Sequence, residues 1–512
     1  MARKAEKKIA GAIRIVIVGL VVIAQILLLA FIVIKLKHNA VYVYLILEIL
    51  GAVAVISLIG NDRNNSYTIA WLVILLILPV FGYLLYIMWG RAATSGRKSA
   101  NIRAAIMRGA EFLDHDPQVY AEFEQYHPSR KTIARFLSRE GFPLYTNTKC
   151  EYFPLGELQF EKMLADLEAA ERFIFMEYFI LSEGRLWDKI YDVLRRKAEQ
   201  GVEVRLMFDD FGSILTAPNN LIKMLESEDI RAIAFNPVHR YISRLYINYR
   251  NHQKITVIDG NVGYTGGTNL ADEYANLYAK HGHWKDAAIR LEGDAVWSLA
   301  VIFLQMWEAE SEQREDYLKY KPTIKKITGD GFYQPFSDGP VNNPHNPAEA
   351  MYRKIISNAK EYVYITSPYL VIDDSMAATL CIAAMGGTDV RIITPKVWDH
   401  WYVHMVTRSN YGRLMKAGVR IYEYSPGYIH AKTIISDDDQ GITGSINMDY
   451  RSFNLHFENG VWICGAPVLK EIKQDIIDTI AVCEEITLDE WKRRPWYIKF
   501  GQAFLRLFAP LF

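Results

Sequence analysis

Cysteine is scarce in this chain of 512 residues. The four cysteines, Cys150, Cys381, Cys464 and Cys483, lie far apart and show neither a paired nor a metal-type spacing. A disulfide framework and a structural zinc site both depend on such spacings. The sequence therefore predicts four reduced thiols in the protein core and no metal site.

An excess of charge of either sign is also absent. Lysine and arginine together number 58, aspartate and glutamate together number 58, and 51% of the residues are hydrophobic. Proteins that bind nucleic acids through a broad surface carry an excess of basic residues on that surface. The balanced charge argues against a nucleic-acid partner of this kind and is typical of a globular enzyme with a membrane anchor.

Three apolar runs lie in the first ninety residues, at 13–34, 41–59 and 69–89. The first run is longer than a normal signal-peptide core, lacks a small-residue cleavage site and is long enough to cross a bilayer. The third ends in aromatic residues that suit a membrane interface. Glu48 leaves it open whether the second run crosses the membrane, because a carboxylate deep in lipid is costly without a partner. We expect residues 1–95 to form a transmembrane anchor of two to three helices.

Basic residues flank this anchor on both sides. Arg3, Lys4, Lys7 and Lys8 precede it, and Arg91, Arg97, Lys98, Arg103 and Arg108 follow it. The positive-inside rule places both flanks in the cytoplasm, which requires an even number of crossings. We therefore expect a multi-pass protein of the cell membrane with its catalytic region on the cytoplasmic face. One of the first two runs would then be partly interfacial.

The chain does contain a repeated tetrad of polar residues. His252, Lys254, Asp259 and Asn269 recur as His430, Lys432, Asp437 and Asn447, each displaced by 178 residues. A small pair precedes each asparagine, Gly266-Gly267 in the first copy and Gly444-Ser445 in the second. A given histidine acquires the other three members by chance with odds of roughly one in ten thousand. The chain therefore carries two copies of one chemical device, at a period too long for a solenoid.

Apolar strands alternate with helical patterns around both copies. Strands are expected at 172–180 and 362–370, and helices at 186–200 and 374–385. This alternation predicts an α/β fold in each half, with two pseudo-twofold-related halves that share one active site at their seam. The expected organisation is the anchor (1–95), a connector (96–148), a first half (149–325), a second half (326–490) and a C-terminal amphipathic segment (491–512).

The motif residues are expected to lie on strands at 253–258 and 431–435. A histidine and a lysine two residues apart on a strand project from one face. Asp259 and Asp437 belong to the same catalytic motifs, but at a hairpin tip they are expected to hold the turn instead of taking protons. Asp286 and Glu458 lie at comparable places downstream of the motifs, and they are the candidate acids that orient the two imidazoles.

Two histidines in one site suit a transfer reaction at phosphorus. A neutral imidazole can attack phosphorus and hold a covalent phosphoryl group, while a protonated imidazole donates its proton to the leaving alkoxide. Lys254 and Lys432 would bind the non-bridging oxygens and stabilise the five-coordinate transition state. Asn269 and Asn447 would bind the same substrate oxygens through their amide groups.

The pattern HxKxxxxD followed by GG or GS and Asn resembles the phospholipase D superfamily over about residues 150–490. With the apolar runs, Glu177-Tyr-Phe-Ile180 and Asn447-Met-Asp-Tyr-Arg-Ser-Phe453, the chain resembles the bacterial cardiolipin synthases over nearly its whole length. The resemblance implies reversible transfer of a phosphatidyl group from one phosphatidylglycerol to another, with release of glycerol. It also implies a phosphohistidine intermediate, no cofactor, His252 as nucleophile and His430 as general acid and then base. The family usually has two apolar runs, so the third run affects the expected membrane topology and leaves the expected chemistry unchanged.

Other functions share these features. A hydrolase, either a phospholipase D or a nuclease, would carry the same double motif, although the neutral charge and the anchor weaken the nuclease hypothesis. A catalytically silent lipid-binding scaffold would not need both complete histidine-lysine pairs. The sequence leaves open whether the second substrate is phosphatidylglycerol or phosphatidylethanolamine, and it leaves open the oligomeric state, a homo-oligomer included.

Two segments have compositions suited to contact with lipid. Residues 496–508 combine aromatic and aliphatic residues with a few cations, as an interfacial helix does, although a helix packed on the domain fits equally well. Residues 241–250 are rich in tyrosine and arginine and suit either headgroup contact or a plain surface loop. A seam placed against the bilayer would concentrate lipid and exclude water. The expected partners are therefore a phospholipid membrane and phosphatidylglycerol.

Overall fold

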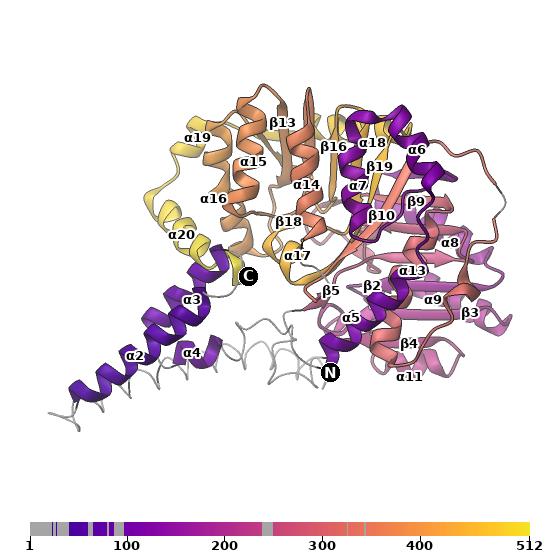
Figure 1. Cartoon of the computed structure of the whole chain (residues 1–512), viewed down its shortest axis with the longest axis horizontal. Coiled ribbons are helices and arrows are strands. Elements are labelled where there is room, and N and C mark those ends of the chain that lie inside the picture. The colour runs from indigo at the N-terminus through magenta and orange to yellow at the C-terminus, as the bar shows by residue number, and fades with distance from the viewer. Residues whose placement is uncertain are drawn as a thin grey trace.

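The computed structural model describes residues 23, 27, 40–59, 65–78, 81–86, 97–237, 249–324, 326–341 and 345–511. The N-terminal helices are α2 (Ala40–Ile59), α3 (Asn65–Ile77) and α4 (Phe81–Leu85), and they extend away from the body of the protein (Figure 1). The second apolar run forms α2, the third is divided between α3 and α4, and the first lies outside the described residues except at 23 and 27. Over the part of the chain described, no helix combines the length and the apolar character needed to cross a membrane.

The first half is built on a mixed sheet. Its strands, in spatial order, are β1 (Thr148–Phe153), β9 (Ala288–Gly293), β7 (Val262–Gly266), β6 (Ile255–Ile258), β2 (Phe173–Tyr178), β3 (Glu203–Asp209) and β4 (Arg231–Phe235). Strands β2, β3 and β4 are parallel, and the others pair antiparallel. The helices of this half are α8 (Gly156–Glu168), α9 (Arg185–Glu199), α10 (Asp210–Ser213), α11 (Leu221–Glu226) and α13 (Val296–Ser311).

The second half repeats this plan. Its sheet has the order β10 (Phe332–Asp338), β19 (His456–Cys464), β17 (Gln440–Gly444), β16 (Thr433–Ser436), β11 (Tyr362–Thr366), β13 (Asp389–Pro395), β14 (Arg420–Tyr424) and β20 (Cys483–Ile486). Its helices are α14 (Pro347–Asn358), α15 (Asp374–Met385), α16 (Trp401–Lys416), α17 (Tyr450–Asn454), α18 (Val468–Ala481), α19 (Leu488–Lys492) and α20 (Trp496–Leu507). A short pair, β12 (Leu370–Val371) and β18 (Met448–Asp449), lies beside the sheet.

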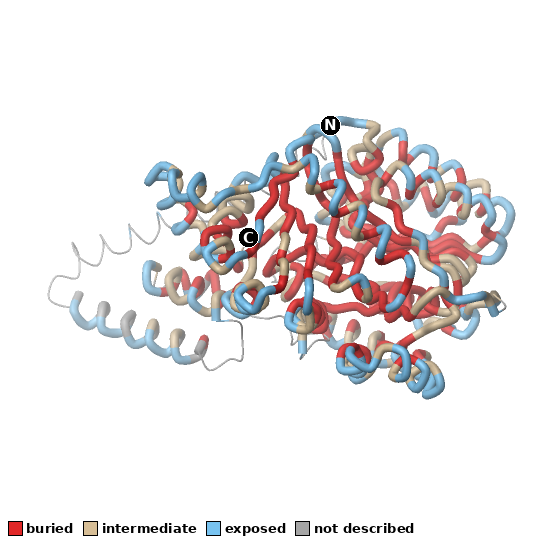
Figure 2. Tube along the Cα trace, turned by 90° about the horizontal axis from the view of Figure 1, so that it is seen from above, coloured by how far each residue is buried: buried red, intermediate tan, exposed pale blue. Residues whose placement is uncertain are grey.

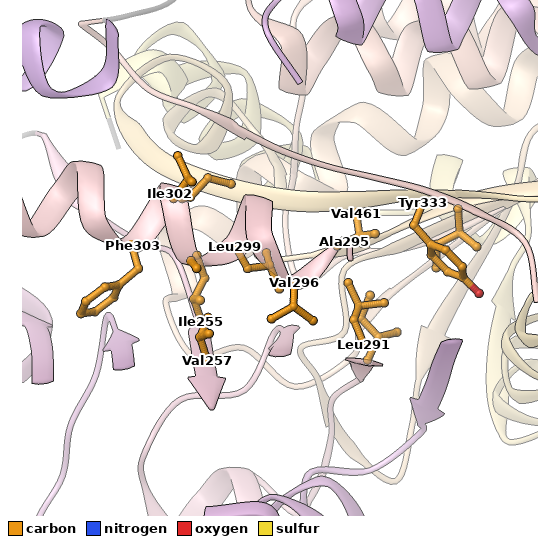
Figure 3. Close-up of a cluster of buried hydrophobic side chains, with 14 of the residues drawn as sticks. Ile255, Val257, Leu291, Ala295, Val296, Leu299, Ile302, Phe303, Tyr333 and Val461 are labelled. Atoms are coloured by element: carbon orange, nitrogen blue, oxygen red, sulfur yellow. The ribbon is translucent and has the colours of Figure 1, made fainter. Parts of the chain in front are cut away.

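A shared core joins the two halves. Helices α13 and α18 lie between the two sheets, and buried residues of both helices and both sheets form one apolar cluster. In Figure 3, Leu299 and Phe303 of α13 lie beside Ile255 of β6, with Val461 of β19 in the same cluster. Figure 2 shows that the buried residues follow the strands through the middle of the molecule, with exposed residues on the surrounding helices. The seam between the halves is therefore a packed interior.

The segment expected to be a connector is folded onto both halves. Its elements are α5 (Arg97–Ala110), α6 (Pro117–Tyr126), the 3₁₀ turn η4 (Pro128–Arg130) and α7 (Lys131–Arg139). Helix α5 packs on α13, where Gln305 Nε2 donates to the carbonyl of Ile106 at 3.0 Å. Ile133 and Leu137 of α7 belong to the outer core of the second half. The apolar faces of α5 and α7 therefore tie the segment to the body formed by the two halves.

The four cysteines are free, but they are not all buried in the core as expected. Cys464 is fully buried, whereas Cys150, Cys381 and Cys483 are half-buried. Burial raises the pKa of the Cys483 thiol to about 12 and raises the pKa of the Cys150 and Cys464 thiols well above the ordinary value. These three thiols therefore stay protonated and poorly nucleophilic at neutral pH.

Short strands exchanged across the seam position the two motifs. Strand β5 (Arg250–Asn251) pairs with β19 of the second half, and β15 (Gly427–Ile429) pairs with β8 (His283–Lys285) of the first half. The strand after each motif begins later than expected, at Ile255 in β6 and at Thr433 in β16. Each histidine-lysine pair therefore lies in the short segment between an exchanged strand and the strand that follows it in the sequence.

Helix α13 is buried over residues 296–309, so a cavity there should destabilise the fold. Leu299 is 0% exposed, and Leu299→Ala is expected to lower the free energy of unfolding by about 2–5 kcal/mol, because the transfer and cavity costs add. The matched control is Leu318→Ala, because Leu318 is 57% exposed. Thermal unfolding in detergent measures both variants. Equal melting temperatures for the two variants would contradict a shared core around α13.

Candidate active site

The two motif histidines meet at the seam of the halves. The main-chain N–H of His252 donates to the carbonyl of Phe457 at 2.9 Å, and that of His430 donates to the carbonyl of Lys285 at 2.7 Å. Both histidines are buried, with 6% of each residue exposed. Each histidine therefore follows an exchanged strand and is held by main chain of the opposite half.

Each imidazole is oriented by a carboxylate of the opposite half. His252 Nδ1 lies 2.9 Å from Oε1 and 3.0 Å from Oε2 of Glu458, and His430 Nδ1 lies 2.7 Å from Oδ2 of Asp286. Because the carboxylate accepts the Nδ1 proton, the neutral ring carries its free lone pair on Nε2. The two candidate acids thus serve the histidines in a crossed arrangement, which the spacing of the motifs did not indicate.

Burial and neighbouring cations favour neutral imidazoles. Burial and the Lys432 ammonium lower the pKa of His430 to about 4. Burial and the Lys254 and Lys432 charges lower the pKa of His252 well below its ordinary value. Burial alone would raise the pKa of Asp286, but the Lys432 charge and the hydrogen bonds from His430 and from the N–H of Ala287 hold it below its ordinary value, so Asp286 remains ionised. The resting site therefore offers neutral imidazole nitrogens, as nucleophilic attack on phosphorus requires.

The two motif lysines lie beside the histidines and are fully buried. Lys254 Nζ donates to the main-chain oxygen of His252, and Lys432 Nζ donates to that of His430 and lies 2.7 Å from its Nδ1. Burial lowers the pKa of Lys254 to about 7 and that of Lys432 to about 8. Two poorly solvated ammonium groups at one seam form a strong site for an anion.

The two motif aspartates lie at the hairpin tips. Asp259 accepts from the main-chain N–H groups of residues 171–173, and Asp437 accepts from those of residues 360–362. Both take a left-handed backbone conformation, with φ of 55° and 54°. The buried Arg130 guanidinium also donates to Asp437 at 2.9 Å. These side chains fasten the hairpins to the strand that begins beside them, and their hydrogen bonds run to main-chain N–H groups and to Arg130.

The two motif asparagines differ from each other. Asn269 Oδ1 accepts from the N–H of Ile180 at 3.0 Å, and its Nδ2 donates to the Tyr274 hydroxyl at 2.9 Å. The amide of Asn269 is thus engaged within the first half through Oδ1 and one Nδ2 hydrogen, and its substrate role stays a prediction. The main-chain N–H of Asn447 donates to Ser452, and its Oδ1 has no hydrogen-bond partner among the described residues.

A buried polar layer holds the residues that precede His252. The Asn251 amide donates to Glu177, and its N–H donates to Asp209 at 3.0 Å. Burial raises the pKa of Glu177 to about 8 and that of Asp209 to about 6. Arg250 is 1% exposed and points to Asp209, so it is unsuited to headgroup contact. Tyr249 of the same tyrosine- and arginine-rich segment is also buried. Residues 241–248 lie outside the described residues.

Several side chains at the site were not identified from the sequence. Ser445 and Ser452 donate to Glu458, the latter at 2.7 Å. The difference between the GG and GS pairs was the sequence signal for Ser445. A Cβ at Gly267 would lie 2.0 Å from Asp286 Oδ1, whereas at the matching position the Ser445 hydroxyl donates to Glu458. Aromatic rings surround the imidazoles. Phe179 and His456 contact His252, and Tyr274, Trp284 and Tyr428 contact His430.

One cluster among the described residues has the proximity of metal ligands: His252, His456 and Glu458. Arg451 Nε, however, donates to His456 Nε2 at 3.1 Å, so the neutral His456 ring carries its proton on Nδ1, the atom that faces Glu458. A metal at Nδ1 would need the proton on Nε2, against the arginine. The hydrogen bonds of this cluster therefore favour a proton-linked network over a metal site.

Two α/β halves with a histidine-lysine pair each define a phospholipase D-like enzyme. The family model described as cardiolipin synthase, PLD-like domain matches residues 163–291 and 352–479. Another, described as Phospholipase_D-nuclease N-terminal, matches residues 49–91. The crystal structure of phosphatidylserine synthase from Haemophilus influenzae has the same fold, with a TM-score of 0.58 at 13% identity over 74% of this chain and 97% of that chain.

Curated relatives agree with these matches. A cardiolipin synthase of Staphylococcus aureus is 33% identical over 93% of this chain and 99% of its own length. An uncharacterised protein of Streptococcus mutans is 36% identical over 90% of this chain and 99% of its own length. The chain therefore belongs to the cardiolipin synthase family of phospholipase D-like proteins, which are phosphatidyltransferase enzymes.

The crossed carboxylates are expected to be essential for turnover. Glu458→Gln or Asp286→Asn should lower the phosphatidyl-transfer rate roughly 10²–10⁴-fold, because the partner imidazole loses the charge that fixes its tautomer and stabilises its cationic form. Initial rates in mixed micelles measure the effect. Glu199→Gln, which changes an exposed acid on α9, is the control and should retain the parental rate. Near-parental rates for both site variants would contradict the orienting role.

Proposed function

We propose that the chain is a cardiolipin synthase that transfers a phosphatidyl group from one phosphatidylglycerol to a second, giving cardiolipin and glycerol. The observation that carries the proposal is the crossed pair of buried histidines, His252 with Glu458 and His430 with Asp286, beside two buried lysines. The family membership and the cardiolipin synthase relatives support the choice of substrate. The remaining steps derive from the chemistry of these six side chains.

In the first step, Nε2 of His252 attacks phosphorus, and the bond between phosphorus and the glycerol oxygen breaks. Protonated His430 gives its Nε2 proton to that oxygen, so glycerol leaves as a neutral alcohol. Entry of the phosphodiester anion favours the protonation of His430, which Asp286 also supports. Lys254 and Lys432 bind the non-bridging oxygens and stabilise the five-coordinate transition state. The product is a phosphatidyl group on His252.

In the second step, the free hydroxyl of another phosphatidylglycerol attacks the same phosphorus. Neutral His430 accepts the hydroxyl proton, the bond between phosphorus and His252 breaks, and cardiolipin leaves. His430 is again protonated and His252 is again neutral, so the cycle closes and each step is reversible. One imidazole thus carries the phosphatidyl group, and the other carries the proton.

The surroundings of the two acids support this division of roles. Glu458 accepts from His252, Ser445 and Ser452, whereas Asp286 accepts from His430 and from the N–H of Ala287. Additional donors disperse the charge of Glu458, so it supports a cationic His252 less than Asp286 supports a cationic His430. The more basic imidazole is suited to proton transfer, and the less basic one is suited to attack.

The C-terminal helix supports a membrane-facing active site. Gln502 of α20 is 3% exposed against α16, while Trp496, Tyr497, Phe500 and Phe504 are 78%, 59%, 67% and 55% exposed. Lys492, Arg493, Arg494, Lys499 and Arg506 lie on or beside the same helix. An exposed aromatic face with flanking cations fits an anionic lipid surface. A multi-pass protein of the cell membrane, with this surface at the cytoplasmic face, accounts for the preference for lipid hydroxyls over water.

A product assay tests the proposed reaction. Purified protein in vesicles of labelled phosphatidylglycerol is expected to release glycerol and form cardiolipin in equal amounts, and His252→Ala or His430→Ala should abolish both products. Phosphatidylethanolamine is offered as acceptor in a parallel reaction. Phosphatidic acid as the sole product would overturn the synthase assignment in favour of a hydrolase. Turnover that survives in both histidine variants would exclude the two-histidine mechanism.

A further inference from the structure

The pseudo-twofold relation places different rings at two matched positions. His456 pairs with Arg250 between β19 and β5, and Trp284 pairs with Tyr428 between β8 and β15. Each lies two residues before an orienting acid, and each ring lies against the histidine that this acid orients. The centroid distance is 5.4 Å from His456 to His252 and 5.5 Å from Trp284 to His430. The ring beside His252 is thus an imidazole, whereas the ring beside His430 is an indole.

The hydrogen bonds of His456 assign its tautomer. Its Nε2 accepts from Arg451 Nε at 3.1 Å, and its Nδ1 lies 3.7 Å from Glu458 Oε1. Burial lowers the pKa of His456 to about 3, so the ring is neutral at physiological pH. A neutral ring that accepts at Nε2 carries its proton on Nδ1. This N–H faces Glu458 across 3.7 Å, which is longer than a hydrogen bond, so it acts on the carboxylate as a nearby dipole.

Glu458 is held by two serine hydroxyls, Ser445 after β17 and Ser452 on α17. Ser452 donates to it at 2.7 Å from α17, the helix that also carries Arg451, and the N–H of Ser452 donates to the helix cap Asp449 at 2.7 Å. His456 faces Glu458 along β19. Neither His456 Nδ1 nor Trp284 Nε1 has a hydrogen-bond partner among the described residues, but His456 Nδ1 lies 3.7 Å from Glu458 Oε1, so its N–H dipole acts on that carboxylate through space.

We propose that His456, fixed by Arg451, is a positioning residue that makes His252 the nucleophilic histidine. It packs against the His252 ring and turns a neutral N–H towards Glu458. The ring contact limits rotation of His252, and the N–H disperses part of the Glu458 charge. The proposal rests on the proposed two-histidine transfer, because it concerns which histidine attacks.

A pH dependence follows from the groups around His252. These are Lys254, Lys432 and His430 from the motifs, Glu458 and His456 from β19, and Arg451 from α17. Loss of the His456 N–H leaves more of the Glu458 charge on His252, which favours the cationic imidazole and raises its pKa. Attack requires neutral His252. The acid limb of kcat/KM, where the rate falls as pH falls, should therefore move to higher pH.

The experiment compares three variants of the full-length protein: His456→Phe, which keeps a ring without N–H groups, His456→Gln, which restores an amide donor, and the matched control Trp284→Phe. The pH profile of kcat/KM is measured with labelled phosphatidylglycerol in mixed micelles. His456→Phe is expected to lower kcat/KM roughly tenfold and to move the acid limb up by about one pH unit. His456→Gln should reverse both changes, and Trp284→Phe should leave the limb in place.

Thermal unfolding of each variant separates a positioning role from a structural one. Three results at an unchanged melting temperature would overturn the proposal. The acid limb stays in place in His456→Phe, it moves equally in Trp284→Phe, or His456→Gln fails to restore it. If the variant does not fold, Arg451→Gln replaces it and should move the limb in the same direction. If the parent protein forms phosphatidic acid in place of cardiolipin, the same profiles are measured on that product, so the two proposals fail independently.

Discussion

The active site depends on the exchange of short strands across the seam. Strands β5 and β15 leave their own halves and pair with β19 and β8, and each motif histidine follows one of them. The same exchange brings each imidazole to the carboxylate of the other half. A buried carboxylate is costly unless it is hydrogen-bonded, so each half needs the other to complete its polar contacts. Neither half alone retains an oriented histidine.

The two halves are similar in backbone but unequal in chemistry. Gly267 leaves room for Asp286, while Ser445 donates to Glu458, and Trp284 and His456 stand at matched positions beside the two imidazoles. The proposed two-step transfer requires such inequality, since one imidazole would bond to phosphorus while the other moves a proton. Duplication supplies two copies of the device, and in this proposal the differences around the acids give each copy its own role.

The sequence was sufficient for the parts of the structure that depend on local spacing. The doubled tetrad and the alternation of strands and helices led to two α/β halves, and the helix expected at 374–385 is α15. The pairing of acids with histidines was not accessible, because the partners lie 206 and 144 residues apart and meet only through strand exchange. The amide of Asn269 is engaged within its own half, by the Tyr274 hydroxyl five residues along the chain and by the N–H of Ile180. The division of the third apolar run into α3 and α4 was likewise not indicated by its composition.

The most direct test of a single two-histidine site is to find the covalent intermediate. His430→Ala keeps the proposed nucleophile and removes the group that activates the incoming hydroxyl. The variant is incubated with a phosphatidylglycerol analogue whose leaving group needs no protonation, quenched, digested and examined by mass spectrometry. The expected result is a phosphatidyl group on the peptide that contains His252, and no adduct in the His252→Ala protein. An adduct on any other residue, or parental product formation without an adduct, would contradict the mechanism.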